Sequence, residues 1–335
     1  MNAPLTVEKA NLSPKDFATD QEVRWCPGCG DYAILKAVQK TLADIGAQPA
    51  TTVFVSGIGC AARFPYYVET FGFHTIHGRA PAVATGVKLA NPELDVWVVG
   101  GDGDMLSIGG NHLMHALRRN VDLNILLFNN EIYGLTKGQY SPTSRVGTRS
   151  PSTPKGSIDR PLSALNMALG IGARFVARAI DTQQKALPGI LEAAWRHKGA
   201  SLVEIIQNCI VYNDEAFAAF TERSVEADAQ VHVVHGQPLI FGKERDKRLK
   251  RSENGYGLEV APLGEGDPLI HDQTDRVLAG MLAALEPPMP VAVGILLDDP
   301  AETSWERAVR AQDAAERRPD ADLGAVMRRG ATWTA

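Results

Sequence analysis

Short apolar runs recur along the middle of the chain, separated by longer stretches that suit helices. The runs are four or five residues long, as expected for buried strands: 52–55, 96–99, 124–128, 174–177 and 202–206. Between them lie stretches that are each long enough for a crossover helix: 80–90, 107–119, 161–169 and 182–197. This alternation predicts an α/β fold with a doubly wound parallel sheet.

The alternation fades after Asp214. Residues 1–220 are therefore expected to form the α/β domain, and residues 221–335 a C-terminal extension or arm. Within the extension, the charged run 243–251 is interpreted as a solvated face, with a docking patch as the alternative. The segment 134–159 is rich in Gly, Pro, Ser and Thr, and such a long loop in a compact domain favours a functional role.

Composition narrows the class of protein. The 335 residues are 44% hydrophobic and 22% charged, as in ordinary folded proteins. The chain has 34 Lys and Arg residues and 39 Asp and Glu residues, which gives a net charge of −5. Binding of nucleic acid through the protein's overall electrostatic field is therefore not expected. The N-terminus shows no secretory signal, and no apolar stretch suits a membrane helix. We therefore expect a cytoplasmic protein with neither nucleic acid nor a membrane as its partner.

A glycine-rich turn, Gly100-Gly-Asp-Gly-Asp104, follows the run 96–99. Glycines at a strand-to-helix turn let the backbone approach a phosphate, and the following helix N-terminus attracts anions. One strand–helix–strand unit later come Asn129 and Asn130. Carboxyl ends of adjacent parallel strands share one sheet edge, so Asp102 and Asn130 are expected side by side. A carboxylate and an amide oxygen suit Mg²⁺, which would bridge the protein and a diphosphate.

This motif, GDG and NN with 25 residues between them, resembles the diphosphate-binding domain of thiamine diphosphate enzymes. The strings GDGDMLSIGGNHLMHALRRN and LLFNNEIYGLTKGQYSPTS resemble the beta subunit of 2-oxoacid:ferredoxin oxidoreductases. The resemblance covers about residues 25–220, and more loosely GQPLIFGKERDK. It implies the thiamine diphosphate-binding fold, with Mg²⁺ held by Asp102, Asn130 and the backbone carbonyl of Ile132. It also implies that nine residues line the cofactor: Ile58, Gly59, Cys60, Ala61, His77, Gly103, Asp104, Gly134 and Leu135.

Four cysteines are too few for a disulfide scaffold. Cys26 and Cys29, in Trp25-Cys-Pro-Gly-Cys-Gly30, form a knuckle that suits a zinc ribbon or an iron–sulfur site. A zinc ribbon needs a second Cys-x-x-Cys about 15–20 residues on, whereas Cys60 and Cys209 stand alone. Each follows a predicted strand, so four thiolates could surround one [4Fe–4S] cluster at the carboxyl edge, with inert buried thiols as the alternative. The family pattern agrees, because its cluster ligands are a C-P-G-C pair, the cysteine of G-I-G-C and a later cysteine after a strand.

Two cations are candidates for substrate binding, with a plain surface cation as the alternative for each. Arg63 lies three residues past Cys60, where a guanidinium can pair bidentately with a carboxylate. The matching position in the family bears on substrate choice. Lys137 begins the long loop, and its matching position in the family bears on coenzyme A. Because a second carboxylate would give Arg63 a partner that pyruvate lacks, we favour 2-oxoglutarate as the substrate.

The resemblance implies a subunit of an enzyme that reversibly converts a 2-oxoacid and coenzyme A into acyl-CoA, CO₂ and reduced ferredoxin. The family places the glutamate that acts on the pyrimidine side of the cofactor on a separate subunit. We therefore expect a heterodimer with an alpha subunit, and ferredoxin docking near the cluster. Two other classes stay open: a non-oxidative thiamine diphosphate-dependent lyase or synthase, and a structural zinc-binding scaffold.

Overall fold

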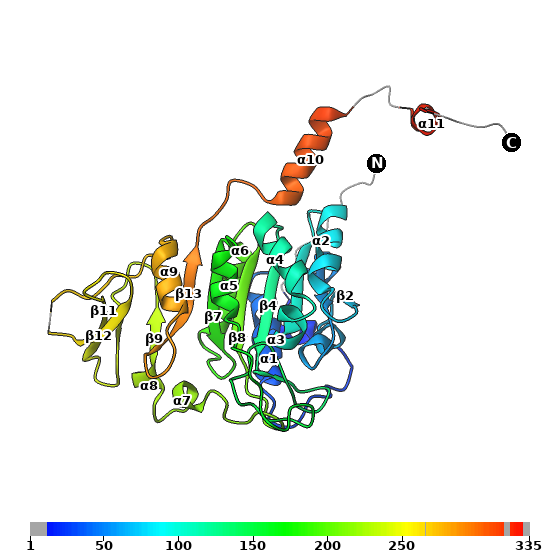
Figure 1. Cartoon of the computed structure of the whole chain (residues 1–335). Helices are drawn as coiled ribbons and strands as arrows, with labels where there is room; N and C mark the ends of the chain where they lie inside the picture. Colours follow the sequence, from blue (N-terminus) through cyan, green and yellow to red (C-terminus); the bar gives the residue numbers. More distant parts are fainter. Residues whose placement is uncertain (1–11, 265, 318–321, 331–335) are drawn as a thin grey trace.

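The computed structural model describes residues 12–264, 266–317 and 322–330. Its centre is an eight-stranded sheet (Figure 1). In spatial order the strands are β2 (Phe71–His74), β1 (Thr52–Ser56), β3 (Asp95–Gly101), β4 (Asn124–Asn129), β8 (Ser201–Ile206), β7 (Phe175–Ile180), β13 (Val291–Asp298) and β9 (Gln230–Val233). Neighbouring strands from β2 to β7 run parallel, which confirms the predicted α/β fold.

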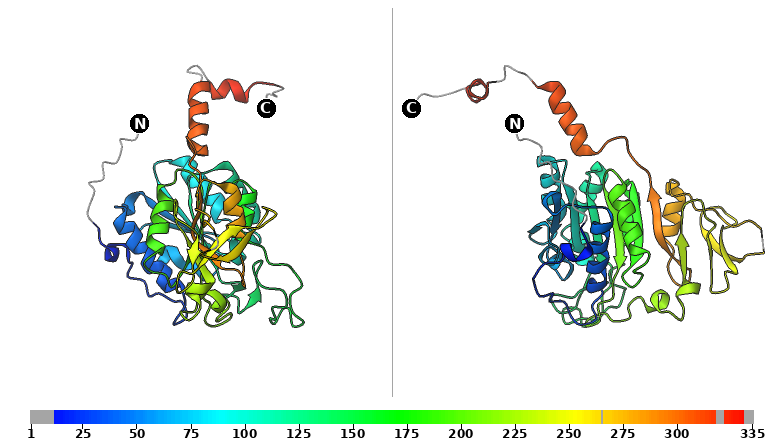
Figure 2. Two further views of the ribbon diagram at one scale, coloured as in Figure 1. Left: turned by 90° about the vertical axis from the view of Figure 1, so that its left-hand side faces the viewer. Right: turned by 180° about the vertical axis from the view of Figure 1, so that it is seen from behind.

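Helices cover both faces of this sheet (Figures 1 and 2). One face packs against α2 (Ala80–Ala90), α4 (Gly110–Arg119), α5 (Ala164–Gly170) and α9 (Arg276–Ala283). The other packs against α1 (Asp31–Asp44), α6 (Leu187–Arg196) and the 3-10 helix η3 (Ala61–Tyr66). Strand β3 is therefore buried on both faces: Val98 packs into one hydrophobic core, and Trp97 and Val99 pack into the other. Strands buried on both faces read as continuous apolar runs, which is why the sequence pattern finds them.

Shorter elements complete the architecture: η1 (Pro14–Phe17), η2 (Pro49–Thr51), α3 (Asp102–Leu106), β5 (Ile132–Tyr133), β6 (Gln139–Tyr140), α7 (Ala218–Thr221) and α8 (Glu226–Ala229). The predicted helix over 107–119 is observed as α4, and α3 precedes it directly after β3. Strand β2 was not predicted. Two of its residues, Phe71 and Phe73, are 62% and 47% exposed. The strand therefore lacks the run of buried apolar residues by which the other strands were predicted. No helix in the described ranges is long and apolar enough to cross a bilayer.

The C-terminal extension is not only an arm. It supplies β9 and β13 to the large sheet, and β13 pairs antiparallel with β7 and parallel with β9. Apolar burial explains this, since Val291, Ala292 and Val293 are each at most 3% exposed. The division between residues 220 and 221 stays a prediction. Helix α10 (Trp305–Glu316) does project from the body, and α11 (Leu323–Met327) lies beyond it (Figure 1).

A small second sheet, β10 (Ile240–Phe241), β11 (Lys247–Arg251) and β12 (Leu258–Pro262), lies beyond β9 (Figures 1 and 2). The interpretation of the charged run as a solvated face is wrong for Arg248 and Leu249, which are buried in β11. The Arg248 guanidinium donates to the backbone carbonyls of Pro262 and Asp267, at 3.3 and 2.8 Å. These hydrogen bonds allow a charged side chain to be buried.

Candidate functional site

The carboxyl edge of β3 and β4 carries the residues predicted to hold Mg²⁺. Gly101 and Phe128 are partners in the β3–β4 register, so the chain leaves both strands at the same edge of the sheet. Asp102, Asn130 and Ile132 all line one cavity at this edge, the cofactor cavity. The structure therefore brings the three predicted magnesium ligands together.

Asp102 is 1% exposed, and its Oδ2 accepts hydrogen bonds from Ser141 Oγ and Thr143 Oγ1, each at 2.5 Å. Burial raises the pKa of the Asp102 carboxyl above its usual value, and the two hydroxyls oppose that shift. A cation beside Asp102 would favour its charged form. The site therefore fits a divalent cation. The sequence marked the loop that carries Ser141 and Thr143 as functional but did not identify either hydroxyl.

The cofactor cavity is also lined by all nine residues that the resemblance implies for cofactor binding: Ile58, Gly59, Cys60, Ala61, His77, Gly103, Asp104, Gly134 and Leu135. At Gly103 a side chain is excluded, because a Cβ atom there would come 2.5 Å from the ring of Tyr133. The Tyr133 hydroxyl donates to the Gly103 carbonyl at 2.7 Å, which holds the ring in that position. The wall at Gly103 is therefore bare backbone, as close approach of a diphosphate requires.

Asp104 joins the loops that surround the cofactor cavity. Its Oδ1 accepts from the backbone N–H groups of Gly78 and Ile58, at 2.8 and 3.3 Å, and lies 2.5 Å from His77 Nδ1. Burial raises the pKa of Asp104, whereas these N–H groups and the histidine lower it. Among the described residues, its buried Oδ2 has no hydrogen-bond partner. A Cβ atom at Gly57 would lie only 1.9 Å from that oxygen, so Gly57 must be glycine.

The four cysteines line a second cavity, the cysteine cavity. Three contacts hold its walls together. Within the knuckle, Cys29 N donates to the Cys26 carbonyl at 3.0 Å. Trp25 Nε1 donates to the Cys60 carbonyl at 2.7 Å, and Gly30 N to the Asn208 carbonyl at 3.4 Å. Segments far apart in the sequence are thereby fixed around one space.

Burial in this cavity disfavours the charged thiolate form of the cysteines. It raises the pKa of Cys60 to about 12 and also raises the pKa of Cys29 and Cys209, and the Asp31 carboxylate adds to all three shifts. Bound metal would reverse this preference, because it stabilises the thiolate form. In residues 12–264, 266–317 and 322–330, no three His, Cys, Asp or Glu side chains converge closely enough to hold a single ion. The four cysteines line one space, and four thiolates are a donor set that suits an iron–sulfur cluster.

The two cavities share a wall. Cys60, Asn130 and Gly134 line both of them. A Cβ atom at Gly134 would lie 3.4 Å from Cys209 Sγ and 3.7 Å from Cys60 Sγ. A group in the cofactor cavity is therefore separated from the sulfurs by little more than a glycine backbone.

Two further residues, one lining each cavity, were not found from the sequence. Asp31 is 1% exposed, lines the cofactor cavity, and has its pKa raised to about 7 by burial, a shift that a hydrogen bond from Cys29 opposes. Gln207 Nε2 lies 3.4 Å from Cys29 Sγ, and Gln207 Oε1 accepts from Asn130 Nδ2 at 2.7 Å. Gln207 stands two residues before Cys209, which is the signal that could have drawn attention to it.

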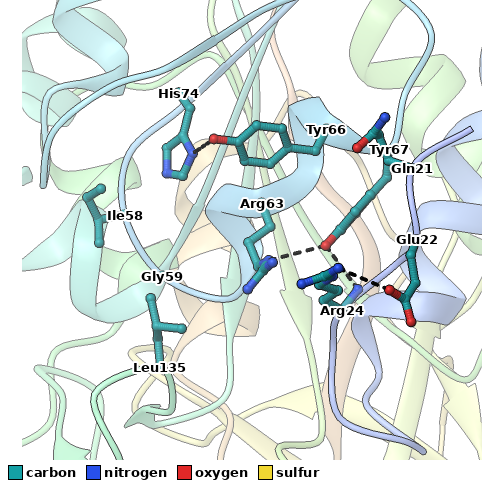
Figure 3. A pocket seen from close by; sticks show the side chains of 10 residues that line it. All are labelled: Gln21, Glu22, Arg24, Ile58, Gly59, Arg63, Tyr66, Tyr67, His74 and Leu135. Atoms are coloured by element: carbon teal, nitrogen blue, oxygen red, sulfur yellow. Dashed lines mark hydrogen bonds and ion pairs between the residues drawn. The ribbon is translucent and has the colours of Figure 1, made fainter. Parts of the chain in front are cut away.

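The two predicted cations occupy different places. Arg63 lines a third cavity of about 420 Å³, the outer cavity, which shares Ile58, Gly59 and Leu135 with the cofactor cavity (Figure 3). Lys137 is exposed at the start of the long loop and lines neither of these cavities. The structure thus brings Arg63, but not Lys137, to the edge of the site.

Comparison with known proteins agrees with this geometry. The family model of the thiamine pyrophosphate enzyme, C-terminal TPP binding domain, matches residues 57–205. The chain is 54% identical over 261 residues to "2-oxoglutarate oxidoreductase subunit KorB" of Mycobacterium tuberculosis (strain ATCC 25618 / H37Rv), covering 77% of this chain and 69% of that protein. It is 48% identical over 258 residues to "2-oxoacid:ferredoxin oxidoreductase 1, subunit beta" of Aeropyrum pernix, covering 76% and 80%.

A solved structure is also similar over nearly its whole length. It is the 2-oxoglutarate:ferredoxin oxidoreductase from Magnetococcus marinus with 2-oxoglutarate, coenzyme A and succinyl-CoA bound. The TM-score is 0.76 and the sequence identity 32%, over 96% of this chain and 97% of that chain. These matches decide against a non-oxidative lyase and against a structural zinc scaffold. With its thiamine diphosphate-binding domain and relatives matched over more than two thirds of their length, the chain belongs to the beta subunits of the 2-oxoacid:ferredoxin oxidoreductases.

Proposed function

We propose that this chain, with an alpha subunit, reversibly oxidises a 2-oxoacid in the presence of coenzyme A to acyl-CoA and CO₂, and that oxidised ferredoxin accepts the two electrons. The observation that carries the proposal is the wall formed by Cys60, Asn130 and Gly134 between the cofactor cavity and the cysteine cavity. Such a wall gives electrons that leave the cofactor site a short route to the sulfurs. A non-oxidative thiamine enzyme has no use for that route.

The cofactor cavity is proposed to hold thiamine diphosphate and Mg²⁺. Asp102, Asn130 and the carbonyl of Ile132 would bind the cation, whose remaining positions suit phosphate oxygens and water. When bound, thiamine diphosphate supplies the nucleophilic carbon for attack on the keto group and takes up the electrons left when CO₂ departs. The protein's part is to bind and orient: Gly103 leaves room for the diphosphate, and Asp104 fixes the surrounding loops.

The cysteine cavity is proposed to hold one [4Fe–4S] cluster, bound by the thiolates of Cys26, Cys29, Cys60 and Cys209. The oxidation releases two electrons, which a cluster passes on one at a time to ferredoxin. Cys26 is exposed whereas the other three cysteines are partly buried, so the cluster would come nearest to the surface at Cys26. We propose that ferredoxin approaches on that side.

The proposed substrate is 2-oxoglutarate. Arg63 lines the outer cavity, beside residues shared with the cofactor cavity, where its guanidinium can pair with the distal carboxylate of a dicarboxylic acid. The names of the M. tuberculosis and M. marinus proteins agree with this choice. Lys137, exposed at the start of the long loop, is proposed to contact coenzyme A. A cytoplasmic location remains our expectation.

One experiment tests the proposal as a whole. The chain is purified anaerobically, alone and in complex with its alpha subunit, and assayed for metal, sulfide and reduction of ferredoxin by 2-oxoglutarate, pyruvate and a branched 2-oxoacid. We expect brown protein with about four iron and four sulfide atoms per chain. We expect activity only in the complex, because the glutamate on the pyrimidine side is proposed to come from the alpha subunit. Stoichiometric zinc without sulfide, or strong activity from the isolated chain, contradicts the proposal.

A further inference from the structure

The outer cavity contains a buried tyrosine that the family resemblance did not point to. Tyr67 is 3% exposed, and its hydroxyl accepts hydrogen bonds from Arg63 Nε at 3.1 Å and from Arg24 N at 3.0 Å. Figure 3 shows both contacts on the same oxygen. The ring is held as well, because it packs edge-on against Trp25 with centroids 4.9 Å apart. Tyr67 is therefore a fixed acceptor at the base of the Arg63 side chain.

The contact leaves the reactive part of Arg63 free. A guanidinium carries five N–H groups, and the one on Nε points to Tyr67, so the four on the terminal nitrogens remain. Within the described ranges, neither terminal nitrogen has a hydrogen-bond or ion-pair partner. The contrast with Arg24 is informative, because its terminal nitrogen lies 3.2 Å from the carboxylate of Glu22. Of the two arginines in this cavity, only Arg63 therefore has its bidentate fork unoccupied.

We propose that Tyr67 is the positioning residue for substrate choice: its hydroxyl fixes Arg63 so that the guanidinium fork meets the distal carboxylate of a dicarboxylic 2-oxoacid. This inference rests on the proposed function. A free arginine side chain samples many rotamers, and binding a carboxylate would have to fix one of them. Tyr67 holds Arg63 before the substrate arrives, so its effect is confined to substrates that have a second carboxylate.

The assembled complex carrying Tyr67→Phe tests this assignment, since the substitution keeps the ring and removes the acceptor. We expect KM for 2-oxoglutarate to rise about tenfold or more, the range for a hydrogen bond in which one partner is charged, as the Arg63 guanidinium is. We expect kcat with 2-oxoglutarate, and both constants with pyruvate, to change less than twofold. The matched control is Tyr32→Phe, because Tyr32 also packs edge-on against Trp25 but its hydroxyl donates to the Trp25 carbonyl. That variant should leave the ratio between the two substrates unchanged.

A double-mutant cycle separates positioning from general damage. In an Arg63→Ala background, Tyr67→Phe should raise KM for 2-oxoglutarate no further, because the residue it positions is gone. Additive effects of the two substitutions would overturn the assignment, as would equal losses with 2-oxoglutarate and pyruvate. Should Tyr67→Phe fail to assemble, Arg63→Lys serves instead, since lysine keeps the charge but has no Nε–H for Tyr67. A wild-type KM in Arg63→Lys overturns the assignment.

The two levels of the proposal fail in different ways. If the wild-type complex does not prefer 2-oxoglutarate over pyruvate, the proposed substrate is wrong and the positioning role falls with it. If the wild-type complex prefers 2-oxoglutarate and Arg63→Ala removes the preference, but Tyr67→Phe leaves it intact, only the role of Tyr67 is wrong.

Discussion

The cofactor cavity and the cysteine cavity share a wall, yet they are built differently. In the cofactor cavity, Asp102 and Asn130 directly follow two paired strands whose register the sheet fixes, and the buried Asp102 carboxylate already accepts two hydroxyl hydrogen bonds. In the cysteine cavity, the sulfurs come from loops that are tied together by single contacts such as Trp25 Nε1 to the Cys60 carbonyl. The first cavity is preorganised by the sheet. The second depends on its loops and on whatever the sulfurs bind.

This difference predicts that the two sites can be lost separately. A change in the cysteine cavity should remove the cluster and leave the sheet edge intact. A change at Asp102 should remove the cation and leave the cluster in place. A variant that loses both at once would show that the shared wall couples the two sites strongly.

The largest effect is expected for Cys60→Ala. Removing one thiolate ligand should abolish the proposed cluster, because metal binding and ordering of the surrounding loops are coupled. Iron and sulfide content should fall to background, and 2-oxoacid-dependent reduction of ferredoxin should cease. Thiamine diphosphate binding, measured by calorimetry with Mg²⁺, should weaken by less than about tenfold. A Cys60→Ala complex with full activity would remove this cysteine from the site.

Asp102→Ala tests the converse case, in which the cation is lost and the cluster is kept. A diphosphate without its bridging cation would face the remaining acidic groups unscreened, so Mg²⁺-dependent affinity for thiamine diphosphate should fall by more than about 100-fold. Calorimetry measures the affinity, and the iron content, expected to match the wild type, is the control. Unchanged affinity would mean that the diphosphate lies elsewhere.

Arg63→Ala should leave both the cofactor cavity and the cysteine cavity intact. Its effect on activity should therefore be smaller than that of the first two variants. Loss of a charged partner costs about 2–5 kcal/mol, so kcat/KM for 2-oxoglutarate should fall at least about tenfold. Pyruvate lacks the second carboxylate, so its kcat/KM should change much less. Steady-state assays with both acids decide the matter, and equal losses would show that Arg63 serves the cofactor, the common carboxylate or the fold.

Thr143→Val is expected to have the smallest effect, and it tests preorganisation itself. It removes one of the two hydroxyls bound to Asp102, so the free energy of unfolding without cofactor should fall by about 1–2 kcal/mol. Thr148→Val is the matched control, because that hydroxyl lies in the same loop but donates to the carbonyl of the exposed Arg145, at 2.7 Å. Denaturant unfolding that gives equal values for the two variants would argue against a preformed site.

The sequence predicted those parts of the structure that follow from local pattern. Strands β3 and β4 read as apolar runs because both of their faces are buried, and the placement of Asp102 and Asn130 follows from the parallel connection between them. The edge strand β2 escaped prediction because its side chains are exposed. Strands β9 and β13 were not predicted because the alternation of strands and helices fades before them. The run 291–297 is apolar like the predicted strands, and only the antiparallel pairing of β13 with β7 lies beyond a local pattern.

Within the site, the sequence identified the groups that carry chemistry better than the groups that hold them. The cysteines and Asp102 belong to short motifs with a chemical rationale. Thr143 is one hydroxyl in a loop full of them, and only the folded loop shows that it reaches Asp102. Tyr67 likewise becomes informative only once its hydroxyl is seen to meet Arg63.

The edge strand β2 affects the tendency of the purified chain to aggregate. In the described part of the chain, β2 pairs only with β1, so one row of its backbone groups has no neighbouring strand. Phe71 and Phe73 are exposed along the same strand. An open apolar edge is a template on which further copies add, and the rate of addition grows with concentration. Preparations of the chain alone are therefore best kept dilute, and turbidity measured against concentration should rise more steeply for the wild type than for Phe73→Lys.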